Sequence, residues 1–337
     1  MSGLRVKEAG PGHSIQDHGR FGWRRFGIST AGAMDRMHLA IANRLVGNPP
    51  ETAAIETLLS GCRLEVVGGP VLIAAAGPGL SLSIDGWPVP AGQSAEVSPG
   101  QMVALSPVRA GVYGYLAAAG GFALPPAMGS LSSHRRSGLG PPPLQAGMTL
   151  PVHSPPILPA QLRLVRVPEH APGPIRFLWG PQEDWFAQDA RAALTSAQWV
   201  IGQRSDRMGL FLDGPALVAL AGSMVSDGVV PGSIQVPPSG TPVILMRDCQ
   251  TTGGYPKIGT VISADLDRLA QMRPGEAVRL EAVSRDTALA ALAGARAAIN
   301  GLRPDPAVRR PDTVWLLHHN LIDGVWSSQP FSEDPMA

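Results

Sequence analysis

The chain has 337 residues, which is long enough for two domains with hydrophobic cores of their own. Its 27 basic and 26 acidic residues give a formal charge of +1, and only 5% of residues are aromatic, which argues against a nucleic-acid-binding surface. Two distant cysteines form no disulfide framework, and the sequence shows neither a signal-peptide core nor an apolar run of membrane-spanning length, so the default expectation is a cytoplasmic protein that does not enter membranes.

The first 120 residues predict a strand, a long loop, a helix and then a series of short strands. Residues 4–7 read as a strand, and residues 10–32 form a glycine-rich loop. Asp35 can begin a helix with apolar residues at helical spacing, which Gly47 ends. Beyond residue 54, short apolar runs alternate with Gly, Pro and Asp, a pattern typical of a barrel or sandwich. These runs are 63–67, 71–75, 80–84, 102–105 and 112–117.

A Pro- and Gly-rich stretch, residues 125–160, separates this part from a second half that begins near Leu162. We expect domains at 1–160 and 161–303, followed by a tail at 304–337 with an apolar island at 314–317. In the second half, the sequence predicts helices at 183–194, 265–272 and 284–299. The strands expected there are 175–179, 217–219, 234–236, 243–246 and 277–282.

The densest polar chemistry follows the apolar run 243–246, so a loop leaving the end of a strand is expected to carry it. This loop contains Lys257, and the chain has only one other lysine, Lys7, among its 27 basic residues. A lysine kept in an arginine-rich chain suggests a need for a compact, mobile charge whose pKa can change on burial. Chance survival of one lysine is the alternative interpretation.

Three blocks of the sequence together resemble the biotin-dependent carboxyltransferase-like family. They are SIQDHGRFGWRRFGISTAGAMDRMHLAIANRLVGN from Ser14, SDRMGLFLDGP from Ser205, and SDGVVPGSIQVPPSGTPVILMRDCQTTGGYPKIGTVISADL from Ser226. The family includes the C subunit of the bacterial ATP-dependent 5-oxoprolinase, an antagonist of a sporulation-kinase inhibitor, allophanate hydrolase subunit 2, and the carboxyltransferase part of urea carboxylase. The resemblance spans about residues 4–282.

The resemblance implies a mainly β fold with short helices, made of two cyclophilin-like β-barrel halves related by a pseudo-repeat. It also implies an enzyme subunit that opens the lactam of 5-oxoproline together with the A and B subunits of the 5-oxoprolinase, of which B is the direct contact. The resemblance also implies that the whole complex uses ATP. This chain itself has no GxxxxGK[ST] motif, so no nucleotide site is expected in it. The alternatives are a regulatory partner of a B-like subunit, or a biotin-dependent carboxyltransferase acting on urea or a similar amide.

The candidate site residues come from both halves. Carboxyl transfer and lactam opening both place negative charge on a carbonyl-type oxygen, which Lys257, Arg207 or threonine hydroxyls could stabilise. Asp248 or Asp227 could act as a base or orient the lysine. We therefore expect Lys257, Asp248 and Asp227 to be catalytic. The expected substrate-binding residues are Gln16, Asp17, Arg20, Arg207, Gln235, Gln250, Thr251, Thr252 and Tyr255.

For each of these residues an ordinary structural role is the competing interpretation, since Asp and Thr favour turns and caps, and Asp17 could brace its loop by pairing with an arginine. Glu56 is expected on an apolar strand, either paired with an arginine at the edge of the core or as a site carboxylate. No metal site is expected, because His13 and His18 lack a third ligand at recognisable spacing, and His318 and His319 read as surface residues.

Two departures from the family pattern bear on function. Cys249 occupies the place of an arginine in the family's Asp-Arg-Gln-Thr-Thr-Gly-Gly-Tyr, which either removes an anion contact or means that the side chain faces the core. Residues 129–150 also lack the closing Arg and Asp of the family pattern.

Overall fold

The computed structural model describes residues 2–153, 155, 158–220 and 224–307, of which those up to Pro306 belong to one compact unit. Strands dominate this unit, so the expected mainly β fold with short helices is confirmed. None of the helices within the described ranges is long and apolar enough to cross a membrane. The predicted apolar island at 314–317 and the pair His318–His319 lie outside the described residues.

Two antiparallel sheets form the first half. One has the strand order β11-β1-β4-β9-β6-β7 and the other β2-β3-β10-β5-β8. The first consists of β1 (Gly3–Glu8), β4 (Cys62–Val67), β6 (Leu82–Ile84), β7 (Trp87–Val89), β9 (Met102–Leu105) and β11 (Thr149–Pro151). The second consists of β2 (Ser14–Gln16), β3 (Ala54–Leu58), β5 (Val71–Ala76), β8 (Ser94–Val97) and β10 (Tyr113–Ala118).

The alternating pattern of β1 and β4 explains why this part folds as sheets. Leu4 and Leu64 are fully buried, whereas Arg5 and Glu65, their neighbours in sequence, lie on the outer face 3.5 Å apart. Side chains at every second position of a strand share one face, so the apolar set of each strand enters the core together. The same alternation recurs in β9.

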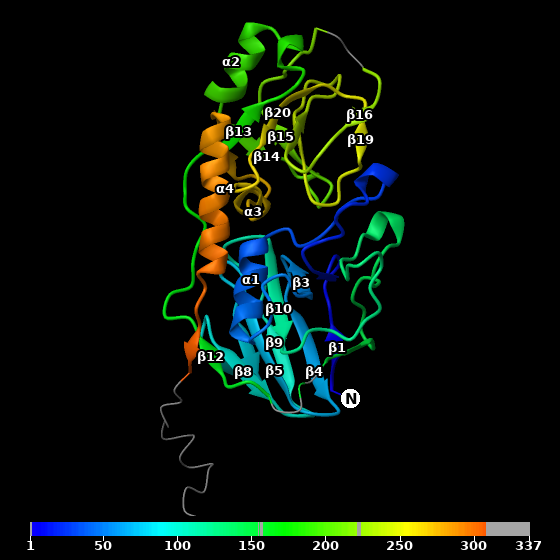
Figure 1. Ribbon diagram of the computed structural model, residues 1–337, viewed down its shortest axis with the longest axis vertical. Helices are drawn as coiled ribbons and strands as arrows, with labels where there is room; N and C mark the ends of the chain where they lie inside the picture. Colours follow the sequence, from blue (N-terminus) through cyan, green and yellow to red (C-terminus); the bar gives the residue numbers. More distant parts are fainter. Residues whose placement is uncertain (1, 154, 156–157, 221–223, 308–337) are drawn as a thin grey trace, which may run out of the picture. The chain divides into compact units, whose positions relative to one another are not determined.

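Helix α1 (Arg36–Leu45) packs against β10 and β5 (Figure 1). Asp35 caps it, because a carboxylate oxygen accepts a hydrogen bond from the backbone N–H of His38 at 3.1 Å, an otherwise unpaired donor of the first turn. Leu39, Ile41 and Leu45 are buried on its apolar face. The predicted helix and its capping residue are confirmed.

The second half is built on an eight-stranded sheet with the order β21-β14-β15-β18-β17-β20-β13-β22. Its pairs are antiparallel except that of β13 and β22. The strands are β13 (Ile175–Trp179), β14 (Trp199–Ile201), β15 (Gly209–Asp213), β17 (Ser233–Gln235), β18 (Val243–Leu245), β20 (Lys257–Val261), β21 (Ala277–Val278) and β22 (Leu280–Ala282). The helices are α2 (Gln188–Ser196), α3 (Leu266–Ala270) and α4 (Arg285–Asn300).

Two small ribbons complete the described strands. One pairs β16 (Asp227–Gly228) with β19 (Thr252–Gly253), and the other pairs β12 (Leu162–Arg163) with β23 (Asp305–Pro306). The tripeptide Ser-Ile-Gln forms a buried strand in each half, as β2 and as β17, which agrees with the expected pseudo-repeat. The larger sheets take their strands from one side of residue 160 only. The exact domain boundary at 160 remains a prediction.

Three local predictions are wrong. The strand expected at 217–219 is only an isolated bridge at Ala219, because the backbone N–H of Leu217 bonds to Gly240 instead of to a strand. The helix expected from residue 183 begins at Gln188, since Phe186 is extended. The single strand expected at 277–282 is divided between β21 and β22, which pair with different neighbours.

Candidate functional site

A cavity of about 620 Å³ is lined by residues from both halves. Apolar side chains such as Tyr113 and Met208 form part of its wall. Its polar lining residues are Ser14, Gln16, Ser133, Arg135, Arg136, Ser205, Asp206, Arg207 and Asp248. Pockets that bind small molecules combine an apolar wall with a few convergent polar groups in this way.

Arg207 is the centre of this polar lining. Its Nε and Nη2 donate to the two carboxylate oxygens of Asp248, both at 2.8 Å, and Nη1 donates to Glu56. A fourth bond runs from Nη2 to the carbonyl oxygen of Gly32 at 2.8 Å. One guanidinium thus holds two carboxylates, and the local formal charge of the three groups is −1.

The surroundings shift the pKa values of this network. Burial opposes the charge on Arg207, but Asp248 and Glu56 beside it hold the arginine's pKa well above its ordinary value. Burial also raises the pKa of Glu56, although Arg207 and the hydroxyl of Tyr115 oppose this shift. The pairing with Arg207 favours the first interpretation of Glu56, an acid paired with an arginine.

The positions of these residues follow from strand pairing. Arg207 lies just before β15, separated from it by Met208, and Asp248 lies shortly after the end of β18. The backbone N–H of Asp248 donates to the carbonyl of Arg207 at 2.9 Å across the paired ends. Glu56 lies on β3 in the first half, where Tyr115 is its partner in β10 and donates its hydroxyl to the carboxylate at 2.7 Å. The pair of Arg207 and Glu56 therefore joins the halves.

Gln16 lines the cavity and has one side-chain acceptor without a partner among the described residues. Its Nε2 donates to Ser14 Oγ at 2.9 Å and to the carbonyl of Ser133 at 3.0 Å, which fixes the orientation of the amide. Its Oε1 is buried and accepts no hydrogen bond from the described residues. A buried acceptor without a donor is costly, so this amide oxygen is an unusual feature of the wall.

Asp17 and Arg20 support this wall and are not among the residues that line the cavity. The carboxylate of Asp17 accepts bonds from Ser130 Oγ at 2.7 Å and from the backbone N–H of Leu131 at 2.6 Å, and Arg20 donates to the carbonyl of Ser132. Asp17 thus braces the loop through serines and backbone groups, not through the arginine pair that the sequence suggested. Burial lowers the pKa of Arg20.

Lys257 forms a separate group within the second half. It is the first residue of β20 and is 4% exposed, and its Nζ donates to the carboxylate of Asp227 and to the carbonyl of Gly228, the latter at 3.0 Å. The hydrogen bond from Lys257 lowers the pKa of Asp227. The ammonium thereby ties the ribbon of β16 and β19 to the large sheet.

The other predicted residues lie near this ribbon. Gln235 Nε2 donates to the carbonyl of Tyr255 at 3.4 Å, and Thr252 lies in β19. Gln250 and Thr251 take part through their carbonyls, which accept from Arg24 at 2.9 Å and from the backbone of Val229 at 3.0 Å. None of these residues is among those that line the cavity at Arg207. Lys257 and these neighbours therefore lie apart from the cavity at Arg207, toward which Asp248 turns.

The side chain of Cys249, which takes the place of an arginine in the family pattern, faces the core. This is the second of the two alternatives given for that position. Cys249 is fully buried and packs with Val229 and Leu245. Burial raises the pKa of its thiol to about 11, and burial likewise raises the pKa of Cys62 to about 12.

We expect neither thiol to react with a disulfide reagent in the folded protein at pH 8, because the thiolate is the reactive form and both thiols are buried and neutral. Two equivalents should react once the chain is unfolded in guanidinium chloride. Rapid reaction of either thiol under native conditions would contradict the assigned burial.

Sequence reasoning missed groups at this site and elsewhere. Arg135 and Arg136, two exposed neighbours in the short 3-10 turn η2 (Arg135–Ser137), line the cavity, and the adjacent pair in the sequence is the signal that could have found them. It also missed Asp35, His38 and His170, whose ligand atoms lie close enough together to hold a metal ion. His170 is too far from the other two in sequence for any spacing rule.

Comparisons with known proteins agree with this architecture. The chain is 40% identical over 275 residues to the C subunit of the 5-oxoprolinase of Haemophilus influenzae, covering 80% of this chain and 88% of that protein. It is 34% identical over 300 residues to the C subunit of the 5-oxoprolinase of Escherichia coli, covering 86% and 94%. The crystal structure of the urea carboxylase of Kluyveromyces lactis superimposes with a TM-score of 0.82 at 23% identity, covering 91% of this chain but 30% of that one.

The likeness to the urea carboxylase structure concerns the fold alone. The model of the carboxyltransferase domain, subdomain A and B, matches residues 26–282, which include β3 with Glu56 and the strand ends with Arg207 and Asp248. The chain therefore belongs to the carboxyltransferase domain A and B family.

Proposed function

We propose that this chain is the C subunit of an ATP-dependent 5-oxoprolinase, which opens 5-oxo-L-proline to L-glutamate together with the A and B subunits. The similarity to two proteins named as C subunits of 5-oxoprolinase, over most of their length and of this chain, carries the proposal. In this proposal ATP is used by the complex, and the B subunit makes the direct contact with this chain.

The chemistry of the cavity at Arg207 suits such a substrate. 5-Oxoproline has a lactam N–H, a lactam carbonyl and a carboxylate. The exposed guanidinium groups of Arg135 and Arg136, which line the cavity, can bind the carboxylate. We place the substrate here, with Asp248 as the group that accepts a proton or orients the attacking water. Each carboxylate oxygen has two lone pairs, so the bonds from Arg207 leave acceptor capacity.

Lys257 and Asp227 enter the proposal as a positioning pair. Lys257 fixes β16 to β20, and the ribbon of β16 and β19 leads back to Asp248 through only three residues, Cys249, Gln250 and Thr251. A displacement of about 1 Å at a reacting group can cost roughly 10²-fold in rate. The ion pair can therefore matter for turnover without contacting the substrate.

Reconstitution tests the proposed activity. The purified chain alone should release no ADP, and a mixture with cognate A and B subunits should release ADP and form glutamate only when 5-oxoproline is added. A and B without this chain form the control. If the full mixture releases no ADP in response to 5-oxoproline, the proposal fails.

Lys257→Met distinguishes an enzyme subunit from a regulatory partner. In the reconstituted complex, kcat should fall by up to roughly 10²-fold, because the ribbon beside Asp248 loses its anchor. Binding to the B subunit, measured by calorimetry, should stay unchanged, since Lys257 is buried. Lys7→Met is the matched control, because Lys7 is the other lysine and its side chain is 47% exposed. Unchanged turnover with weakened binding would favour the regulatory interpretation.

A biotin-dependent carboxyltransferase is the remaining alternative. It would predict that biotin or urea binds to the isolated chain, which a calorimetric titration measures. We expect no heat of binding from either compound.

A further inference from the structure

A second polar cluster lies outside the cavity at Arg207. Asp35 caps α1, His38 lies in the first turn of this helix, and His170 comes from the segment between β12 and β13. Asp35 Oδ2 lies 2.6 Å from Nδ1 of His38 and 2.8 Å from Nε2 of His170. One ligand atom from each residue lies within 4.8 Å of the other two. Two segments far apart in sequence thus converge on one carboxylate oxygen.

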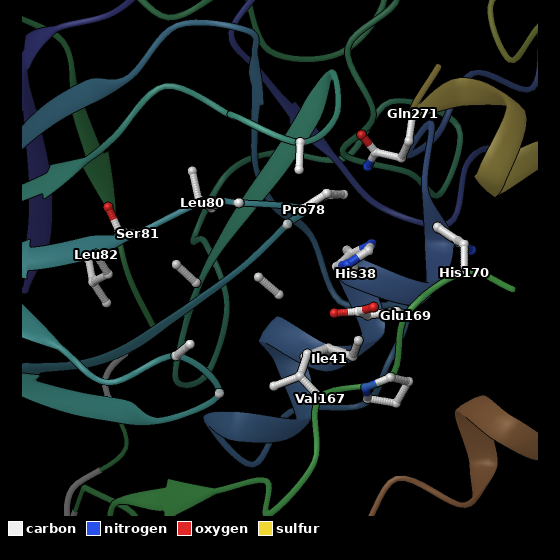
Figure 2. Close-up of a pocket in the computed structure, with 18 of the residues that line it drawn as sticks. His38, Ile41, Pro78, Leu80, Ser81, Leu82, Val167, Glu169, His170 and Gln271 are labelled. Carbon is white, nitrogen blue, oxygen red and sulfur yellow. The ribbon is translucent and has the colours of Figure 1, made fainter. Parts of the chain in front are cut away.

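His38 and His170 line a cavity of about 550 Å³ of their own (Figure 2). Together with Gln271 they occupy the end of the cavity opposite Ser81 and Leu82. Most other lining residues are apolar. The polar end of this cavity is therefore accessible to water and small molecules, while its walls offer few competing ligands.

The two carboxylate oxygens of Asp35 have different roles, one in capping the helix and the other in facing the imidazoles. Its Oδ1 accepts the backbone N–H of His38, which completes the cap, and Oδ2 remains for the imidazoles. Gln271 donates its Nε2 to Oδ2 at 2.8 Å. The orientation of this amide is fixed, because its Oε1 accepts the backbone N–H groups of Val112 and Tyr113 at 2.8 and 2.9 Å. Such outer partners orient the ligating carboxylates of metal sites.

We propose that Asp35, His38 and His170 bind one divalent transition-metal ion, with Zn²⁺ as the best match. Two imidazole nitrogens and one carboxylate oxygen form a ligand set of open zinc sites and of non-haem iron sites. Water from the cavity completes the coordination. The ligating nitrogens must be unprotonated, so in the metal-bound state the N–H of each neutral imidazole would lie on its other ring nitrogen.

Metal titration of the full chain tests this site. The protein is stripped with a chelator and carries His318→Ala and His319→Ala, so that the adjacent histidine pair in the sequence does not contribute. Calorimetry with Zn²⁺ should show one equivalent bound. Titration with Co²⁺ should produce a visible absorption band that saturates at one equivalent. His38→Ala and His170→Ala should each abolish stoichiometric binding. Gln271→Leu should weaken it by roughly 10–100-fold, as for other outer-shell partners.

His153→Ala is the matched control and should bind one equivalent, since His153 is exposed and, among the described residues, only its backbone takes part in hydrogen bonds. Far-UV circular dichroism of each metal-free variant checks its fold, and His170→Gln replaces any variant that unfolds. The proposal is overturned if the stripped chain binds no stoichiometric Zn²⁺ or Co²⁺. It is also overturned if folded variants at His38 and His170 both bind as the parent does. Neither readout depends on 5-oxoprolinase activity.

Discussion

Replacing Arg207 with methionine should lower the free energy of unfolding by about 3–5 kcal/mol, the range for removing one partner from a buried ion pair. The substitution leaves Glu56 and Asp248, which are 1% and 7% exposed, without their cation. Urea denaturation at pH 7, followed by circular dichroism, measures the loss. The difference in unfolding free energy between the variant and the unmodified protein should shrink as the pH falls. Burial already raises the pKa of Glu56, and once protonated this side chain needs no cation beside it.

Arg5→Met is the control for this prediction. Arg5 pairs with Glu65 at 3.5 Å on the outer face of the first sheet, and its side chain is 47% exposed. Exposed pairs of this kind contribute about 0–1 kcal/mol. Equal losses for the two variants would show that Arg207 contributes no more than a surface arginine.

Replacing Asp248 with asparagine should reduce kcat of the reconstituted complex by about 10²–10⁴-fold, the contribution typical of a general acid or base. Asparagine has nearly the same shape but accepts a proton far less readily. Glu56 remains paired with Arg207, so the fold and the binding of the B subunit should be retained. Rates of ADP release and of glutamate formation provide the measurement.

Asp213→Asn provides the comparison, because Asp213 lies at the exposed end of β15 and is not among the residues that line the cavity. Its turnover should equal that of the unmodified complex. If Asp248→Asn turns over at the same rate as Asp213→Asn, Asp248 is not the proton acceptor.

Local patterns in the sequence were sufficient for much of the fold. The strand at 102–105 and the helix capped by Asp35 depend on periodicity and capping, which neighbouring residues determine. The strand expected at 217–219 failed because Leu217 makes a hydrogen bond to Gly240, a contact that periodicity does not encode.

The site was harder to predict because its groups meet across long stretches of chain. Arg207 and Asp248 were both named from the sequence, but the pairing of Arg207 with Glu56 spans 151 residues and joins the halves. The composition argument for Lys257 located a buried ion pair but not its distance from the cavity. The cluster of His38 and His170 could not be foreseen, because a residue's position along the chain does not reveal what lies beside it once folded.

The scarcity of lysine also determines how the chain can be labelled. Lys257 is enclosed, with 5% of its side chain exposed, whereas Lys7 projects from β1 with 47% exposed. An amine-reactive fluorophore or crosslinker therefore has Lys7 as its principal side-chain target. A mixture with the proposed A and B subunits can then report which of them approaches β1, without any engineered cysteine.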